Sequence, residues 1–103
     1  MDNTSVITKR LYEARTAKGI SQKQLGIAAG IDEFSASPRI NQYERGKHVP
    51  DFATVERLAL VLNVPTPYFY TRDDALAKLI LRYGQMSAAE KEKLIQFAAA
   101  DES

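Results

Sequence analysis

Residues 21–46 read SQKQLGIAAGIDEFSASPRINQYERG and predict two short helices joined by a tight connection. Ser21 and Gln24 match a capping box, in which two residues satisfy each other's free backbone N–H groups at a helix start. Gly30 stands where the first helix would end in a left-handed turn. Gly26 lacks a side chain, so we expect the two helices to cross closely there.

The second helix of the pair is predicted from Pro38 to about Arg45, because Ser37 and Pro38 suit an N-cap and a first helical residue. Gly46 would end it. The small and polar residues 32–36 predict a loop between the two helices. The residues expected to be buried in this pair are Leu25, Ala28, Ile40 and Tyr43.

The rest of the chain has helical periodicity, and no segment shows a convincing strand alternation. We therefore expect an all-α fold. The other predicted helices cover residues 6–18, ended by Gly19; 52–62, capped by Asp51 and ended by Asn63 and Pro65; a very short helix containing Tyr68, Phe69 and Tyr70; 71–83, closed by Gly84; and a last helix that begins at the Ser87–Glu90 capping box and continues to about residue 98.

The spacing of apolar residues predicts which helix faces are buried. In the helix after Asp51 the buried face begins with Phe52. The Tyr68–Tyr70 aromatics are expected in the core. The helix after Thr71 should bury Leu76, Leu79, Ile80 and Tyr83, which lie at the i, i+3, i+4 and i+7 positions.

Composition excludes several classes of protein. The 103 residues are enough for one domain, and 45% hydrophobic with 26% charged residues is ordinary for a globular chain. Without cysteine and with one histidine, the chain cannot form disulfides or a cysteine- or histidine-rich metal site, so we expect no metal and no cofactor. Asp73 and Asp74 are paired carboxylates, but they sit at a predicted helix start without a nucleophile–base pair, so an enzyme is not expected.

The N-terminus shows no signal peptide, and the longest strongly apolar run, residues 58–62, is far too short to cross a bilayer. We therefore expect no membrane association and a cytoplasmic location. Net charge is +1, but residues 1–50 carry eight basic and five acidic residues, and residues 51–103 carry six and eight. A basic half followed by an acidic half fits a polyanion-binding module with a helper segment, and ordinary solvated helix faces would give the same pattern.

The sequence resembles the helix-turn-helix family of Cro and CI-type regulators, the XRE-like proteins, over residues 6–70. The residues that carry the resemblance are Arg15, Lys18 through Gly26, Ile40 through Lys47, Pro50 through Phe52, and Leu58 through Pro65. The resemblance implies a five-helix repressor-type DNA-binding domain over residues 1–70. Two additional C-terminal helices would form an extension over residues 71–103. It also implies a prokaryotic, sequence-specific transcriptional regulator of phage or plasmid type, located at the nucleoid.

By this resemblance the third helix would enter the major groove and read base edges with its N-terminal part. The residues expected to contact bases are Ser37, Arg39, Asn41 and Gln42. Arg39 could pair with guanine, and Asn41 or Gln42 with adenine. Arg39 and Gln42 are three residues apart and are expected to share an exposed face.

The resemblance also implies phosphate contacts and one internal ion pair. Gln22, at the start of the second helix, and Lys47, after the third, match phosphate-contacting positions, and Lys23 and Arg45 are further candidates. His48 is better explained as an ordinary loop residue. Arg15 and Glu44 match the arginine and glutamate that pair inside the domain and fix the third helix, so Glu44 is expected to be structural although it lies beside the DNA site.

The chain departs from the family pattern between Ile31 and Tyr43, where it has about four extra residues, placed within Asp32–Ala36. Asp32 and Glu33 would repel phosphate, so we expect them to cap helix ends or point away from DNA. Gly26 stands where alanine is usual and suggests a closer helix crossing or a less stable second helix.

Residues 71–103 predict two amphipathic helices with more apolar surface than isolated helices could hide. They would extend the core or pair with a second subunit. The family commonly reads near-palindromic double-stranded DNA, which calls for a homodimer. The alternative hypothesis is an antitoxin-type or other protein-interaction module, in which the acidic helical tail binds a protein partner.

Overall fold

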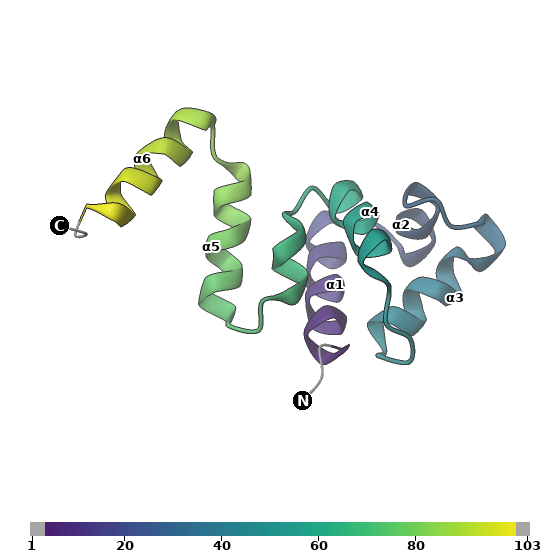
Figure 1. Cartoon of the computed structure of the whole chain (residues 1–103). Coiled ribbons are helices and arrows are strands. Elements are labelled where there is room, and N and C mark those ends of the chain that lie inside the picture. The colour runs from purple at the N-terminus through teal and green to yellow at the C-terminus, as the bar shows by residue number, and fades with distance from the viewer. Residues whose placement is uncertain (1–3, 101–103) are drawn as a thin grey trace.

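The computed structural model describes residues 4–100, and every regular element in that range is a helix (Figure 1). The expected all-α fold is confirmed. The elements are α1 (Thr4–Lys18), α2 (Gln22–Ala28), α3 (Glu33–Glu44), α4 (Phe52–Leu62), the 3₁₀ helix η1 (Thr66–Tyr70), α5 (Asp74–Gln85) and α6 (Ala88–Ala99).

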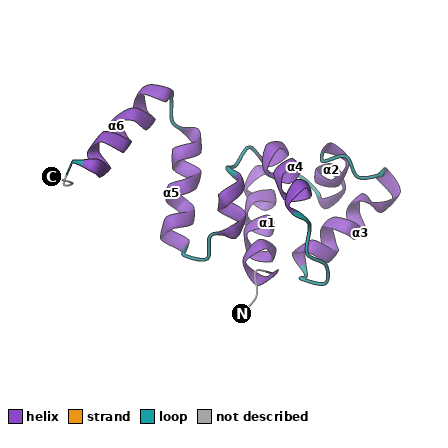
Figure 2. Ribbon diagram, in the orientation of Figure 1, coloured by secondary structure: helices purple, strands orange, loops and turns teal. Residues whose placement is uncertain are grey.

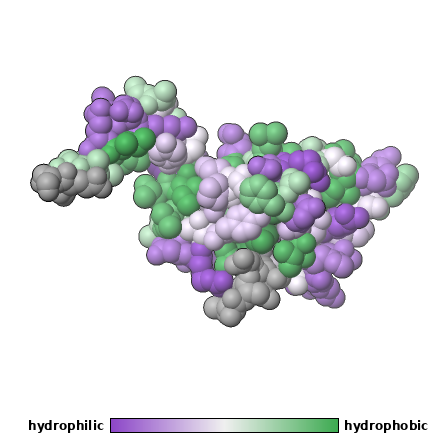
Figure 3. Space-filling view, viewed as in Figure 1, coloured by the Kyte–Doolittle hydropathy of each residue, from purple (hydrophilic) through white to green (hydrophobic). Residues whose placement is uncertain are grey.

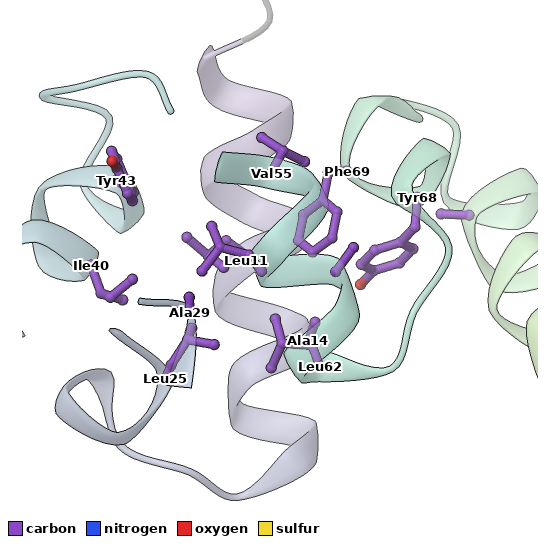
Figure 4. Close-up of a cluster of buried hydrophobic side chains, with 13 residues drawn as sticks. Leu11, Ala14, Leu25, Ala29, Ile40, Tyr43, Val55, Leu62, Tyr68 and Phe69 are labelled. Carbon is purple, nitrogen blue, oxygen red and sulfur yellow. The ribbon is translucent and has the colours of Figure 1, made fainter. Parts of the chain in front are cut away.

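We call residues 4–70 the head; α1 crosses its centre, with α2, α3, α4 and η1 packed around it (Figure 2). Side chains from all five elements meet in one buried cluster (Figure 4). Its largest fully buried members are Leu11, Leu25, Ile40, Val55, Leu58 and Phe69. The head therefore has a continuous core to hold α2 and α3 in place.

Most predicted helix ends are confirmed. Both expected capping boxes form, and the Asp51 carboxylate accepts a hydrogen bond from the Thr54 N–H at 2.8 Å. Asn63 ends α4 in the left-handed conformation, with φ 57°. Gly30 has φ +92°, a backbone angle that favours glycine, and it turns the chain from α2 towards α3.

The third helix begins five residues earlier than predicted. The Asp32 carboxylate accepts a hydrogen bond from the Phe34 N–H at 3.0 Å and caps the helix there, so the predicted loop over residues 32–36 is wrong. Pro38 consequently lies inside α3, not at its first position, and it has no N–H to donate to the carbonyl of Phe34. Residues 33–36, which were expected to belong to an insertion relative to the family, form the first turn of α3.

Three predicted burial positions outside α5 are also wrong. Leu25 of α2 is buried as expected, but Ala28 is exposed, and the buried alanine is Ala29, the C-cap residue that follows the helix. At the start of α4, Phe52 is 59% exposed and stacks on Tyr70, with 6.2 Å between the ring centroids. Tyr68 and Phe69 are buried as expected, but Tyr70, which was also expected in the core, is 38% exposed.

Helix α5 differs from its prediction at both ends and on its buried face. It starts at Asp74, because the Asp73 carboxylate caps it by accepting from the Leu76 N–H at 2.9 Å. Gly84 does not close it but lies inside it beside Pro65, where a Cβ atom would come within 2.7 Å of the proline ring. The buried residue is Ala77, which leaves Leu76 and Leu79 about half exposed.

Arg10 joins α1 to the start of α5, a role that the sequence analysis did not predict. It is 3% exposed and donates to the carbonyls of Thr71 and Arg72 at 2.9 and 3.0 Å. It also pairs with Glu13 and Asp74, each at 3.0 Å. Hydrogen bonds from Lys9 and Arg10 lower the pKa of Asp74. Its burial could have been predicted from its position between Ile7 and Ala14, on the buried face of α1.

The close crossing at Gly26 is confirmed and generates a prediction about stability. A Cβ atom on Gly26 would lie 2.7 Å from the Ala36 Cβ and 2.9 Å from its Cα. We expect Gly26→Ala to lower the free energy of unfolding by about 1–3 kcal/mol, because the crowding outweighs alanine's better helix propensity. Urea unfolding followed by circular dichroism measures this change.

Ala28→Ser is the matched control, since it adds one atom to an exposed position of the same helix. Its effect should stay within about 0.5 kcal/mol. Equal stability of Gly26→Ala and the natural chain would show that α2 and α3 can separate without cost.

Candidate nucleic-acid interface

An ion pair between Arg15 of α1 and Glu44 of α3 fixes the end of α3 against the head. The Arg15 Nη2 donates to Glu44 Oε1 at 3.0 Å, and its Nε donates to Glu44 Oε2, which makes the pair bidentate. The side chains are only 14% and 5% exposed. Hydrogen bonding to Glu44 raises the pKa of Arg15. The third nitrogen of the Arg15 guanidinium, Nη1, donates to the Ile20 carbonyl at 3.0 Å.

Gln22, the first residue of α2, extends this pair into a network across three helices. Its side-chain amide donates to Glu44 Oε1 at 3.0 Å and to Asn41 Oδ1 at 3.2 Å. The structure thus places Gln22 and Asn41 against each other, both half-buried. Their side chains orient α3 relative to α2, in addition to any contact they make with a ligand.

The predicted base-reading residues lie along α3 with different exposure. Arg39 is exposed, and Ser37 and Gln42 are half-buried. Arg39 and Gln42 line one shallow groove together with Tyr43, His48 and Val49. The structure therefore brings Arg39 and Gln42 together, and it places Ser37 inside the helix, so its predicted role as N-cap is wrong.

The predicted phosphate-contacting cations surround this helix. Lys23 is exposed near the start of α2, and Arg45 and Lys47 are exposed after α3. Gly46, with φ +74°, turns the chain so that the Lys47 N–H donates to the Gln42 carbonyl at 2.9 Å. This turn holds Lys47 beside the C-terminal end of α3.

Residues 4–100 contain no cluster of three or more histidine, cysteine, aspartate or glutamate side chains that could hold a metal ion. Within the same described range, no helix is long and apolar enough to cross a membrane.

Comparisons with known proteins identify the same region. A helix-turn-helix family model matches residues 11–69. The solved crystal structure of the transcriptional regulator BswR is similar to the chain over 90% of this chain and 92% of that one, with 48% sequence identity and a TM-score of 0.86. That likeness extends beyond the family region into residues after η1. No match was found among curated proteins.

The Arg15–Glu44 pair predicts a large effect of removing one partner. Glu44→Ala leaves the guanidinium of Arg15 without its charge partner in a poorly exposed site, so we expect a loss of about 3 kcal/mol in the free energy of unfolding. The double variant Arg15→Met/Glu44→Ala should lose less than the sum of the single changes Arg15→Met and Glu44→Ala. Urea unfolding of the four proteins gives this coupling.

Lys9→Ala is the matched control, because it removes one partner of the exposed Lys9–Asp74 pair. We expect it to cost less than about 1 kcal/mol. Additive effects at Arg15 and Glu44 would contradict the role given to their pairing.

Proposed function

The chain belongs to the helix-turn-helix family of the Cro and CI type, and on that premise we propose that it is a sequence-specific DNA-binding transcriptional regulator. We propose further that it acts as a repressor of phage or plasmid type and works at the nucleoid, in the cytoplasm. The observation that carries the proposal is the network of Arg15, Glu44 and Gln22, which fixes α3 while Arg39 stays exposed.

In this proposal α3 enters the major groove of double-stranded DNA and reads base edges. Arg39 has a planar guanidinium that can donate two hydrogen bonds to a guanine. Gln42, in the same groove as Arg39, can pair with an adenine through its amide. Ser37 and Asn41 are further base-contacting residues, and Asn41 retains its amide N–H groups while its oxygen accepts from Gln22.

Phosphates on either side of the groove would be met by Lys23, Arg45 and Lys47. Gln22 lies at the start of α2, where free backbone N–H groups favour an anion. Contacts of this kind supply affinity without choice of sequence. They weaken as the salt concentration rises, because releasing counterions from the DNA then gains less free energy. In this proposal the Arg15–Glu44 pair does not contact DNA, and its role is to hold α3 in position.

The proposal predicts a salt-dependent and residue-specific DNA affinity. On a duplex selected from random sequences, Arg39→Ala and Gln42→Ala should each cost about 1–3 kcal/mol and reduce discrimination among sequences. Lys47→Ala should weaken selected and unselected duplexes alike and lower the salt slope of log Kd by about 1. Fluorescence anisotropy at several salt concentrations measures both effects.

Lys9→Ala removes an exposed cation of α1 that lies outside α2, α3 and residues 71–103, and it should leave all of these affinities unchanged. If the chain binds no duplex at low salt, the proposed function is wrong.

We also propose that residues 71–103 form a homodimer interface, which would present two copies of α3 to a near-palindromic site. Helix α6 has no buried residue, and the chain measures 55 × 31 × 22 Å because α6 projects from the head (Figure 1). Its radius of gyration of 15.4 Å exceeds the roughly 13 Å of a compact domain this long.

The exposed apolar residues of the two C-terminal helices support this interface. Leu76 and Leu79 are exposed at i and i+3 on a face of α5 beside the buried Ala77. Tyr83, at i+7, is half-buried, with the Lys91 ammonium over its ring. Ile95 and Phe97 add exposed apolar surface on α6, and Figure 3 shows apolar surface on both helices. A second copy would remove these side chains from water.

The homodimer proposal predicts that Ile95→Lys lowers the molecular mass measured by light scattering from twice the chain mass of 11.5 kDa towards the single mass. A charge on this face cannot be buried without a partner. Gln96→Lys is the matched control, because it places the same charge one residue away on the polar side of α6, and it should leave the mass unchanged.

A natural chain that is monomeric at micromolar concentration would contradict the homodimer. It would favour the other reading of residues 71–103, in which their exposed apolar surface receives a protein partner.

A further inference from the structure

The first turn of α3 presents one large apolar side chain to solvent. Phe34 is 86% exposed, the highest value among the exposed large hydrophobic residues of the described chain. It belongs to the first turn of α3, among the residues expected to exceed the family spacing. The start of α3 lies at the outer edge of the head, on the side away from α6 (Figure 1). Removing an aromatic ring from water is strongly favourable. Because the Phe34 ring is exposed in the free chain, a ligand that covers it would gain this free energy on binding.

The first turn of α3 is held by a cap and by packing against α2. Asp32 caps it through the Phe34 N–H. Ala36 in the same turn is fully buried, against the close-packed Gly26 of α2. Phe34 therefore has a fixed backbone position relative to the rest of α3.

The exposed surface of α3 opposite its buried residues changes in character along the helix. Phe34, Pro38, the half-buried Asn41 and the C-cap residue Arg45 recur at i, i+4, i+7 and i+11, opposite the buried Ala36, Ile40 and Tyr43. The two residues nearest the start of the helix are apolar and the next two are polar. The apolar pair lies at the end that a recognition helix directs at base edges.

The charges around Phe34 also indicate the kind of contact it makes. Asp32 and Glu33 are both exposed beside it and would repel phosphate. The turn is therefore poorly suited to the sugar–phosphate backbone. The apolar group that the major groove offers is the 5-methyl of thymine.

We propose that Phe34 contacts the 5-methyl group of a thymine and so specifies a thymine in the DNA site. The inference rests on the proposed function, since it requires α3 in the major groove. It assigns a base-reading role to the extra turn of α3, which lies upstream of Ser37, Arg39, Asn41 and Gln42.

The test replaces each thymine of the selected duplex in turn by deoxyuridine, which lacks only the 5-methyl group. For the natural chain, one replacement per half-site should weaken binding about fourfold, the value for removing one methyl-sized apolar contact. Phe34→Ala should bind the thymine and deoxyuridine duplexes equally, at about the affinity of the natural chain for deoxyuridine. Phe34→Leu keeps an apolar side chain and should retain part of the discrimination.

Leu60→Ala is the matched control, because Leu60 is 84% exposed on α4, outside α3, and its loss should leave the fourfold difference intact. Phe34 is exposed, so Phe34→Ala should unfold at the same temperature as the natural chain, with the same mass in light scattering. The inference is overturned if no deoxyuridine substitution weakens the natural chain, if Phe34→Ala still discriminates, or if Phe34→Ala changes the mass. In each of these cases the chain still binds DNA, whereas failure to bind any duplex at low salt overturns the proposed function itself.

Discussion

The bidentate ion pair of Arg15 and Glu44 is the constraint on which the rest of the interface depends. It joins the last turns of α1 and α3, and Gln22 adds α2 by donating to the same carboxylate. Because the carboxylate and guanidinium are nearly removed from water, each needs the other to compensate its desolvation. The carboxylate of Glu44 is therefore compatible with a surface proposed to bind DNA, because the guanidinium of Arg15 neutralises its charge.

Local chemistry made much of the fold predictable. Helix ends at Ser21, Asp51, Asn63 and Ser87 follow from side chains or backbone angles that act within three residues, so no tertiary information was needed. The predicted start of α3 was wrong because the sequence offers two possible N-cap residues, Asp32 and Ser37. Asp32 is the one used, and the turn that it caps is the turn in which Ala36 packs on Gly26. Such a choice depends on the partner helix, which periodicity cannot show.

Tertiary contacts also decide which residues of the site are available. Ser37, Arg39, Asn41 and Gln42 were all expected on α3, and all lie there, but Asn41 is held by Gln22 whereas Arg39 is exposed. The sequence likewise hid Arg10, because a basic residue on a helix is most often solvated. Its partners explain its burial: the carbonyls of Thr71 and Arg72, more than sixty positions away, and the carboxylates of Glu13 and Asp74.

Pro38 has a consequence for how this helix can vary. It interrupts the hydrogen-bond ladder between the first turn of α3 and the segment that continues to Glu44, and the ion pair and the turn at Gly46 hold the latter independently. Changes at the exposed residues Glu33 and Phe34 therefore leave the register of Arg39 and Gln42 unchanged, whereas Ala36 must stay small to pack on Gly26. The tip of α3 can thus vary in chemistry while the helix behind it and the head keep their geometry.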